Sequence, residues 1–473
     1  MALPLPPSFQ NRMQAQLGEE YTAFTEALSQ TSPTSVRVNM AKMGLPTGLQ
    51  PVPWTETGFY LPIRPSFTLD PQFHGGAYYV QEASSMFLEQ ALKQSVNLEE
   101  PLAVLDLCGA PGGKSTHLAS LISEESLLVS NEVIRARAGI LAENIQKWGS
   151  GNVLVTNNDP SHFAKLTGFF DVLVVDAPCS GEGMFRKDPD AMNEWSEANV
   201  KLCSERQRRI LMDVWDCLKP GGVLIYSTCT YNAEENEDNL AWLAQQQDVE
   251  TIALELQPDW HITETQEQGM RGYRFYPHKT QGEGFFLAVV RKTGGDEAGK
   301  FKKSKRPYLV AASKQEKASV QNWLKSPADW ELVKHQDTLR ALPTAWMLEL
   351  EQLYENLRVV YGGIELAEAL KGNAKPLPAL ALSQHLAQDA FPRADVDLPT
   401  ALKFLHREDV ALEDAANGWV LVQFNGVPLG WGKKLQNRVN NHYPKEWRIR
   451  MSLDDALKAE NLERQFVLGG SIK

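Results

Sequence analysis

The fold is decided by the stretch Ala103-Val104-Leu105-Asp106-Leu107-Cys108-Gly109-Ala110-Pro111-Gly112-Gly113-Lys114. Its first five residues form an apolar run of strand length, the rest is a glycine-rich loop, and a helical pattern begins near Thr116. Glycines let such a loop approach a ligand closely, and the first amides of the following helix stay free to bind it. The stretch therefore predicts a strand, a ligand-binding loop and a helix in succession.

Further short apolar runs follow at similar spacing, with helical stretches between them, at residues 127–131, 152–156, 171–176, 222–227 and 285–290. Near-continuous runs of Val, Leu and Ile are typical of buried, mostly parallel strands. We therefore predict a doubly wound, Rossmann-like α/β domain over residues 76–293. In such a domain, ligands bind at the carboxyl ends of the strands.

A glycine loop in this position can bind one of three ligands, or it can be only a tight turn. A nucleotide P-loop requires glycine five residues before Gly113, where this chain has Cys108. The G-x-G-x-x-G pattern of dinucleotide-binding proteins is also absent. A loop for S-adenosylmethionine (SAM) remains, with Gly112 and Gly113 making room for the methionine end.

Acidic residues follow three of the predicted strands and favour the SAM interpretation. Glu132 follows the second strand, where a carboxylate can accept hydrogen bonds from both ribose hydroxyls of an adenosine. Asp159 follows the third strand and is expected near the adenine edge, and Asp176 ends the fourth. A single carboxylate in such a place is usually a turn or cap residue. Carboxylates after successive parallel strands all face one crevice, which makes a ligand site the better explanation.

The five cysteines are scattered, and they indicate neither a disulfide framework nor a metal site. Cys108, Cys203 and Cys217 are expected to be small buried apolar residues. Cys179 and Cys229 are different because each follows a predicted strand, in Asp176-Ala177-Pro178-Cys179-Ser180-Gly181 and in Ser227-Thr228-Cys229-Thr230. Both strand ends should open onto the same crevice as the glycine loop.

At 473 residues the chain is long enough for about three domains. Residues 1–75 predict a small α+β module, with a helical pattern from Phe9 to Tyr21 and a strand over 35–39. Residues 294–306 have the composition of a basic linker, and one or two further modules follow.

No run is long enough to span a membrane and no signal peptide is evident, so a cytoplasmic protein is expected. The net charge of −12 argues mildly against a polyanionic partner, although a local basic surface would suffice.

The glycine loop, the Pro-Cys motif and the Thr-Cys motif occur here in the order that resembles the Nol–Nop–Sun family of RNA cytosine-5 methyltransferases. The resemblance implies that Cys229 attacks carbon 6 of cytosine, which activates carbon 5 for methylation, and that Cys179 assists release of the product. Asp176 would hold the amine or ring nitrogen of the base. The implied SAM contacts are Cys108, Gly109, Ala110, Pro111, Gly112, Gly113, Lys114, Glu132, Asp159 and Asp176. The loop departs from the family pattern at Gly109, where alanine is usual.

Three other stretches are similar to the bacterial RsmF type within this family: residues 181–188, the helix-like 79–85, and 429–433 with 441–445. That type methylates cytidine in small-subunit (16S) ribosomal RNA. The resemblance implies RNA-binding roles for residues 1–75 and for a PUA-like module over 401–473, with an intermediate α+β module over 307–400. The open alternatives are transfer RNA as substrate and a non-catalytic SAM- or RNA-binding assembly factor, which the intact Cys179 and Cys229 disfavour.

The stretch 425–450 is rich in basic and aromatic residues, the composition of a binder of unpaired RNA. Trp431, His442, Tyr443 and Trp447 are the rings expected to stack on bases. The cations expected to meet phosphate are Lys433, Lys434, Lys445 and Arg448, joined by Arg186, Lys187 and the basic residues of 300–306. A monomer without metal, acting on ribosomal RNA within the small subunit, is the expectation.

Overall fold

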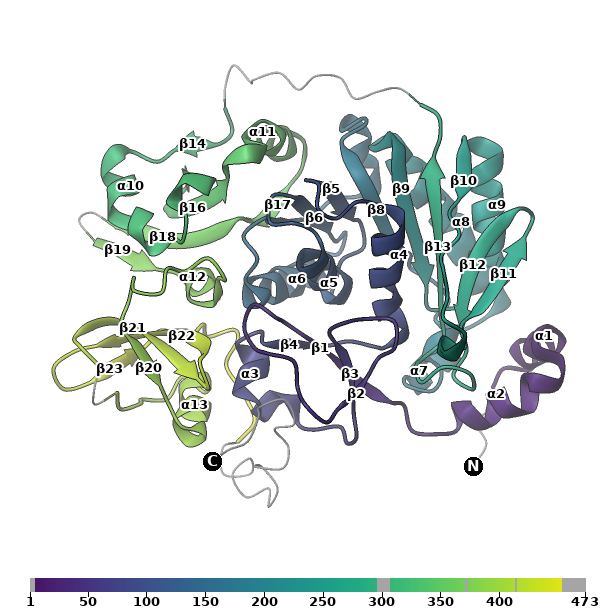
Figure 1. Ribbon diagram of the computed structural model, residues 1–473, viewed down its shortest axis with the longest axis horizontal. Coiled ribbons are helices and arrows are strands. Elements are labelled where there is room, and N and C mark those ends of the chain that lie inside the picture. The colour runs from purple at the N-terminus through teal and green to yellow at the C-terminus, as the bar shows by residue number, and fades with distance from the viewer. Residues whose placement is uncertain (1–4, 296–306, 371–372, 413–414, 453–473) are drawn as a thin grey trace.

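The computed structural model describes residues 5–295, 307–370, 373–412 and 415–452. Its centre is a ten-stranded sheet (Figure 1). Five neighbouring strands run parallel in the order β9-β8-β5-β6-β7, and they are β5 (Ala103–Asp106), β6 (Leu127–Asn131), β7 (Val153–Thr156), β8 (Phe170–Asp176) and β9 (Leu218–Thr228). The prediction of a Rossmann-like α/β domain is confirmed.

Helices cover both faces of this sheet because successive strand residues point to opposite sides. Leu105 packs into the core beneath α8 (Glu197–Trp215), α9 (Glu237–Gln246) and α11 (Met347–Asn356). Val104, its neighbour in the chain, packs into the opposite core with α4 (Leu88–Ser95), α5 (Gly113–Leu121) and α6 (Arg135–Trp148). Strand runs that are buried on both faces carry few polar residues, which is why the sequence showed unbroken apolar runs.

The order of the strands reverses between β5 and β8. From β5 the chain proceeds through β6 to β7 on one side, and it then crosses back to β8 and β9 on the other. The loops that leave β5 and β8 therefore diverge and open a crevice, which is the usual ligand site of this architecture. Antiparallel strands extend the sheet beyond β9: β10 (Val249–Thr251), β11 (Thr263–Glu267), β12 (Met270–Phe275) and β13 (Phe285–Lys292).

The N-terminal part has a four-stranded sheet in the order β2-β3-β1-β4 and three helices. The elements are α1 (Pro7–Leu17), α2 (Tyr21–Leu28), β1 (Thr34–Val38), β2 (Gln50–Pro51), β3 (Gly58–Leu61), α3 (Pro71–His74) and β4 (Tyr78–Val80).

The prediction of a helix-like stretch over 79–85 is wrong. Tyr78–Val80 pairs with β1 as a strand, and only a 3-10 helix, η3 (Ser84–Phe87), follows, because strand pairing outweighs local helical preference.

Helices α1 and α2 lie apart from the sheet of their own module, beside α7 (Pro189–Glu194), as Figure 1 shows at its lower right. Phe9 and Phe24 pack in one cluster with Phe185, Tyr231 and Tyr276. The first helices of the chain thus cover the loops that follow Cys179 and Cys229.

Two further sheets form the C-terminal part. The five-stranded sheet contains β14 (Val310–Ala311), β15 (Trp330–His335), β16 (Thr338–Pro343), β18 (Ile364–Leu370) and β19 (Asn373–Pro376), with helices α10 (Lys314–Val320) and α12 (Pro378–Leu382). The four-stranded sheet contains β20 (Arg393–Asp395), β21 (Gly418–Phe424), β22 (Val427–Lys434) and β23 (Val439–Asn441), with α13 (Leu398–Leu405). One more strand, β17 (Val359–Gly362), pairs with β7 and joins the central sheet. Within the described residues, no helix combines the length and apolarity needed to cross a membrane.

The carboxyl end of α6 joins three parts of the molecule. Asn39 of the N-terminal part donates to the Trp148 carbonyl at 2.9 Å, and Gln384 of the C-terminal part donates to the same oxygen at 3.0 Å. Lys42 of the N-terminal part donates to the Lys147 carbonyl at 2.5 Å. These contacts satisfy carbonyls that a helix end leaves unpaired.

Gly76 is required at this junction, and its replacement provides a test. A Cβ at Gly76 would lie 1.9 Å from the Lys147 carbonyl oxygen, and the residue has a positive φ of 68°. We expect Gly76→Ala to lower the free energy of unfolding by about 3 kcal/mol or more. The matched control is Gly48→Ala, where φ is 80° and no atom lies within 4 Å, and a loss of about 1 kcal/mol is expected. Equal losses in urea titrations would contradict this account of the junction.

Candidate active site

The glycine loop is held against α6 and the N-terminal sheet. The Gly109 amide donates to the Asn131 carbonyl at 2.8 Å, and Arg137 donates to the Ala110 carbonyl at 2.8 Å. Asn144 donates to the Pro111 carbonyl at 2.7 Å. Helix α5 begins at Gly113, three residues earlier than the sequence pattern indicated. The first amides of α5 therefore face the crevice, as a ligand loop requires.

Buried Arg37 of β1 holds the first turn of α5 in place through hydrogen bonds. Its guanidinium donates to the Thr116 hydroxyl at 2.6 Å, to the Gly113 carbonyl at 3.3 Å and to the Gln81 side chain at 2.8 Å. The N-terminal sheet thus takes part in shaping the loop.

Asp106 is a site residue that the sequence reasoning missed. It ends β5 directly before the loop, is fully buried, and accepts a hydrogen bond from the Ser115 hydroxyl at 2.6 Å. Burial raises the pKa of Asp106 to about 7, and its Oδ1 atom has no hydrogen-bond partner within the described residues. A carboxyl group inside an otherwise apolar strand run was the available signal. A Cβ at Gly109 would lie 2.7 Å from the Ser115 hydroxyl, so the glycine leaves room for this pair.

Lys114 and Asp176 form an ion pair across the crevice, with 2.8 Å between Nζ and Oδ2. Asp176 also accepts from the Ser227 hydroxyl at 2.8 Å, which ties the ends of β8 and β9 together. Although burial opposes its charge, Asp176 and then Asp106 raise the pKa of Lys114. The glycine loop and the Pro-Cys motif are therefore coupled electrostatically.

Glu132 and Asp159 have different surroundings. Glu132 is buried after β6, accepts from the Ile134 amide at 2.8 Å, and lies 3.4 Å from Arg137. Asp159 caps the short helix η4 (Pro160–Lys165) by accepting from the Ser161 amide at 3.1 Å. Hydrogen bonding from Ser161 lowers the pKa of Asp159, which keeps it ionised. Burial, then Asp106, Asp176 and Glu132, raise the pKa of Cys108, so these carboxylates surround the loop.

The two cysteines at strand ends meet, with 3.0 Å between the Sγ atoms of Cys179 and Cys229. The Cys229 amide also donates to the Cys179 sulfur at 3.3 Å. The hydrogen bond with Cys229, followed by burial, raises the pKa of Cys179 well above its usual range. Cys203 on α8 and Cys217 after it are buried, as expected for apolar residues.

A buried carboxyl group that the sequence reasoning missed joins the two cysteine loops. Glu235 ends η6 (Ala233–Glu235) and accepts from both the amide and the hydroxyl of Ser180, the residue after Cys179. The Ser180 hydroxyl lies 3.1 Å from the hydroxyl of Thr230, the residue after Cys229. Gln207 donates to Glu235 at 3.0 Å. Burial raises the pKa of Glu235 to about 7. One carboxyl group thus sets the relative position of both loops.

A second buried acid anchors the covering helix. Glu182 forms an ion pair with Arg12 of α1 at 2.7 Å and accepts from the Trp195 indole at 2.9 Å and from the Tyr231 amide at 3.2 Å. Helix α1 is therefore fixed over the loops that carry the two thiols.

Arg186, predicted to contact RNA, has an interior partner instead. Its side chain is 5% exposed and pairs with buried Glu283 at 3.0 Å. It also donates to the Gly282 carbonyl at 2.6 Å. This pairing leaves little of the guanidinium for a phosphate. The neighbouring Lys187 is exposed, in keeping with its predicted role.

In the C-terminal sheet, two of the rings predicted to stack on bases are buried, and that prediction is wrong for them. Trp431 is 1% exposed, and its indole donates to the Leu377 carbonyl at 2.8 Å. Tyr443 is also 1% exposed. Alternate residues of β22 point inward, so composition could not separate core rings from surface rings. Half-buried Trp419 and His442 pack together instead, with ring centroids 4.6 Å apart.

The predicted basic contacts of this sheet differ in exposure. Lys433 lies over the Trp419 ring at 5.2 Å, and Lys434 donates to the Leu412 carbonyl. Lys445 and Arg448 are exposed. The basic residues of 300–306 lie outside the described residues. RNA contact by each of these cations stays a prediction.

The fold and the site place this chain in the class of RNA methyltransferases. Three family profiles of such enzymes match its sequence. The profile of the 16S rRNA methyltransferase RsmB/F matches residues 93–291. The N-terminal domain of 16S rRNA methyltransferase RsmF matches residues 5–83, and the methyltransferase RsmF PUA domain matches residues 391–449.

The chain belongs to the family of ribosomal RNA small subunit methyltransferase F, whose members are SAM-dependent enzymes. It is 33% identical over 476 residues to the member from Aliivibrio salmonicida, covering 93% of this chain and 97% of the relative. It is 33% identical over 471 residues to the member from Vibrio parahaemolyticus, with the same coverage. The crystal structure of NSun6 from Pyrococcus horikoshii with SFG shares the fold (TM-score 0.52, 21% identity), covering 62% of this chain and all of that one.

Proposed function

We propose that this protein transfers a methyl group from SAM to carbon 5 of a cytidine in small-subunit (16S) ribosomal RNA. The observation that carries the proposal is the contact of Cys179 and Cys229, 3.0 Å apart, at strand ends that share a crevice with the glycine loop. A protein that only bound SAM and RNA would need no such pair. We also propose that it acts on RNA within the small subunit, in the cytoplasm and as a monomer; the names of its relatives support ribosomal RNA as the substrate.

The residues around the crevice fit SAM. The glycine loop offers the amides of α5, and Glu132 is a buried carboxylate suited to ribose hydroxyls. Val133 and Ile134, which follow it, are 55% and 51% exposed, so apolar surface is available for an adenine ring. The buried Asp106 Oδ1 atom, which lacks a partner in the described part of the chain, and the charged pair of Lys114 and Asp176 could meet the methionine end. SAM supplies the methyl group as an electrophile when bound.

The chemistry of the chain's own residues begins with Cys229. Its thiolate adds to carbon 6 of the cytosine, and the electron pair of the ring double bond moves to carbon 5. Asp176 is 37% exposed in its side chain and can hold the amine or ring nitrogen of the base. Carbon 5 becomes the nucleophile that an unactivated cytosine lacks.

Release requires the loss of the carbon 5 proton together with the bond between carbon 6 and Cys229. The sulfur of Cys179 lies beside that of Cys229 and is placed to take this proton. Because the pKa of Cys179 is raised, its thiol must first lose its own proton to solvent, and the thiolate then takes the carbon 5 proton. The double bond then re-forms and the Cys229 thiolate leaves.

The proposal is tested by incubating the protein with methyl-labelled SAM and either 16S ribosomal RNA or isolated small subunits from cells that lack the modification. Nucleoside mass spectrometry is expected to find labelled 5-methylcytidine in the ribosomal substrate. Transfer RNA is incubated in parallel. Label in transfer RNA alone would overturn the assigned substrate, and label on another nucleoside would overturn the reaction.

A further inference from the structure

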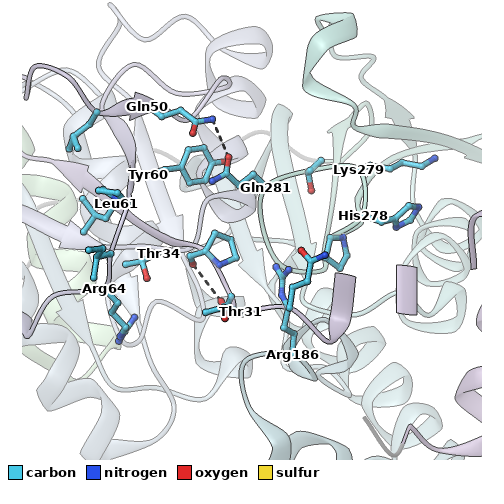
Figure 2. Close-up of a pocket in the computed structure, with 18 of the residues that line it drawn as sticks. Thr31, Thr34, Gln50, Tyr60, Leu61, Arg64, Arg186, His278, Lys279 and Gln281 are labelled. Carbon is cyan, nitrogen blue, oxygen red and sulfur yellow. Dashed lines mark hydrogen bonds between the residues drawn. The ribbon is translucent and has the colours of Figure 1, made fainter. Parts of the chain in front are cut away.

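A groove away from the glycine loop lies between the N-terminal part and the catalytic part of the molecule. It has a volume of about 980 Å³ and two facing walls. One wall comes from the N-terminal part, at residues 30–34, 48–50 and 60–64, and the other from residues 277–281 with Arg186. Figure 2 shows Tyr60, Leu61 and Arg64 on one side and His278 and Lys279 on the other. Gln50 donates to Gln281 across the groove at 3.1 Å.

The lining of the groove combines apolar side chains with many polar groups. Among the described lining residues there is no Asp or Glu, while hydroxyl and amide groups come from Gln30, Thr31, Ser32, Thr34, Gln50 and Gln281. Such groups match base edges and ribose hydroxyls. Buried Tyr60 adds a hydroxyl that has no hydrogen-bond partner in the described part of the chain. Buried polar groups usually find partners, so a bound polar ligand would complete this one.

Arg64 is the cation of the groove that can meet a phosphate. Lys279 is paired with Glu20 at 2.8 Å, and Arg186 with Glu283. Arg64 is exposed, and no carboxylate of the described residues pairs with it. Its guanidinium lies 5.4 Å from the Phe67 ring, which orients the side chain.

Backbone contacts connect both walls of the groove to the loops that carry the thiols. Its wall at 277–281 continues into Gly282–Gly284, and Gly183, four residues after Cys179, packs against Gly284. The Gly183 amide donates to the Cys229 carbonyl at 2.9 Å. Ser32 of the opposite wall donates to Glu283 at 2.5 Å. The groove walls therefore pack directly against the loops that hold the reacting base.

We propose that this groove binds the single-stranded RNA next to the target cytidine, with Arg64 contacting a backbone phosphate. This inference rests on the proposed function, because a base that leaves its helix to reach Cys229 needs its neighbours held in place. Phosphate contacts fix register, while the amides and hydroxyls of the walls contact the exposed bases and riboses.

The salt dependence of binding tests the phosphate contact. Wild type, Arg64→Ala and Arg64→Lys are titrated with a 16S ribosomal RNA transcript at several salt concentrations. Arg64→Ala is expected to lower the magnitude of the slope of log Kd against log salt by about 0.7 to 1, and Arg64→Lys to restore it. Arg206→Ala is the matched control, since Arg206 is an exposed arginine on α8 outside the groove.

Crosslinking gives a second measurement that does not depend on one charge. The Ile63 side chain is 76% exposed at the groove, so Ile63→p-benzoylphenylalanine should crosslink to RNA near the methylated cytidine. An unchanged slope for Arg64→Ala, or crosslinks only to distant RNA, would overturn the proposal that RNA binds in this groove. If the protein still methylates RNA in that case, the proposed function stands. Failure of the wild type to methylate any RNA would overturn the proposed function itself.

Discussion

Replacing Cys229 with alanine is expected to abolish methylation of RNA, with a loss of at least about a thousandfold. Without the thiolate, nothing activates carbon 5 of cytosine. Since Cys229 lies at the end of β9 beside the crevice, its removal should leave the SAM site intact. The measurement is incorporation of labelled methyl from SAM into 16S ribosomal RNA, together with calorimetric titration of SAM.

Replacing Cys179 with alanine should have a different result. The adduct between Cys229 and the RNA should still form, but without the neighbouring sulfur its breakdown slows, and a covalent complex should accumulate. Denaturing gel electrophoresis would detect this complex as protein of reduced mobility that requires both SAM and RNA and disappears after nuclease treatment. Cys203→Ala is the matched control, because Cys203 is a buried cysteine on α8, away from the strand ends.

The assignments are open to contradiction. If the covalent complex accumulates with Cys229→Ala and not with Cys179→Ala, then Cys179 is the nucleophile and Cys229 assists release. Retained activity in Cys229→Ala would remove the covalent mechanism. Because the two Sγ atoms are only 3.0 Å apart, position alone does not distinguish them, and the trapped species does.

Replacing Glu235 with glutamine is expected to lower kcat about 10- to 100-fold while KM for RNA and the affinity for SAM change little. Glutamine has nearly the shape of glutamate, but one acceptor oxygen becomes a donor. Glu235 accepts from the Ser180 amide at one oxygen and from the Ser180 hydroxyl at the other, so in the variant the side-chain amide must donate to that hydroxyl and the direction of this hydrogen bond reverses. Cys179 and Cys229, each next to a residue of this network, would then shift relative to the base.

Glu234→Gln is the matched control, since Glu234 is the exposed neighbour on the same short helix. A role in folding alone would lower the amount of active protein without changing kcat per SAM-binding site. Equal kcat values for the two variants would contradict the positioning role.

The pH dependence of stability gives an independent check on Glu235. Burial raises its pKa from 4.5 to about 7 in the folded protein, so the folded state binds the proton more tightly than the unfolded chain. The resulting stabilisation is complete below pH 4.5 and is lost as pH rises through about 7. The free energy of unfolding of the wild type, relative to Glu235→Gln, should therefore fall by about 3 kcal/mol across this window. Urea titrations of both proteins at several pH values measure this difference. If the free energies of unfolding of the two proteins change with pH in parallel, the raised pKa of Glu235 is contradicted.

Local sequence predicted those features of the molecule that depend on periodicity and on motif order. The apolar runs located the parallel strands because strands buried on both faces carry few polar residues. The glycine loop was located because a strand that turns into a ligand-binding helix needs glycine there. Asp176, Cys179 and Cys229 were predicted to share a crevice because the carboxyl ends of parallel strands lie at one edge of a sheet.

Where segments distant in the sequence meet, the sequence was a poor guide. The stretch 79–85 was expected to be helical, but pairing with β1 makes its start a strand. Trp431 and Tyr443 are core residues because each faces inward, which composition does not reveal. Arg186 is committed to Glu283, 97 residues further along the chain.

By itself, then, the sequence determined the class of the sheet, the loop after its first parallel strand and the two thiols at strand ends, since each is encoded within a few consecutive residues. Only the tertiary structure decided that Glu235 joins the two cysteine loops, that α1 covers them through Arg12, and that Arg64 and residues 277–281 line one groove. The physical reason is that the partner of a buried charge or a groove wall is chosen by packing of distant segments, and local preferences do not specify that packing.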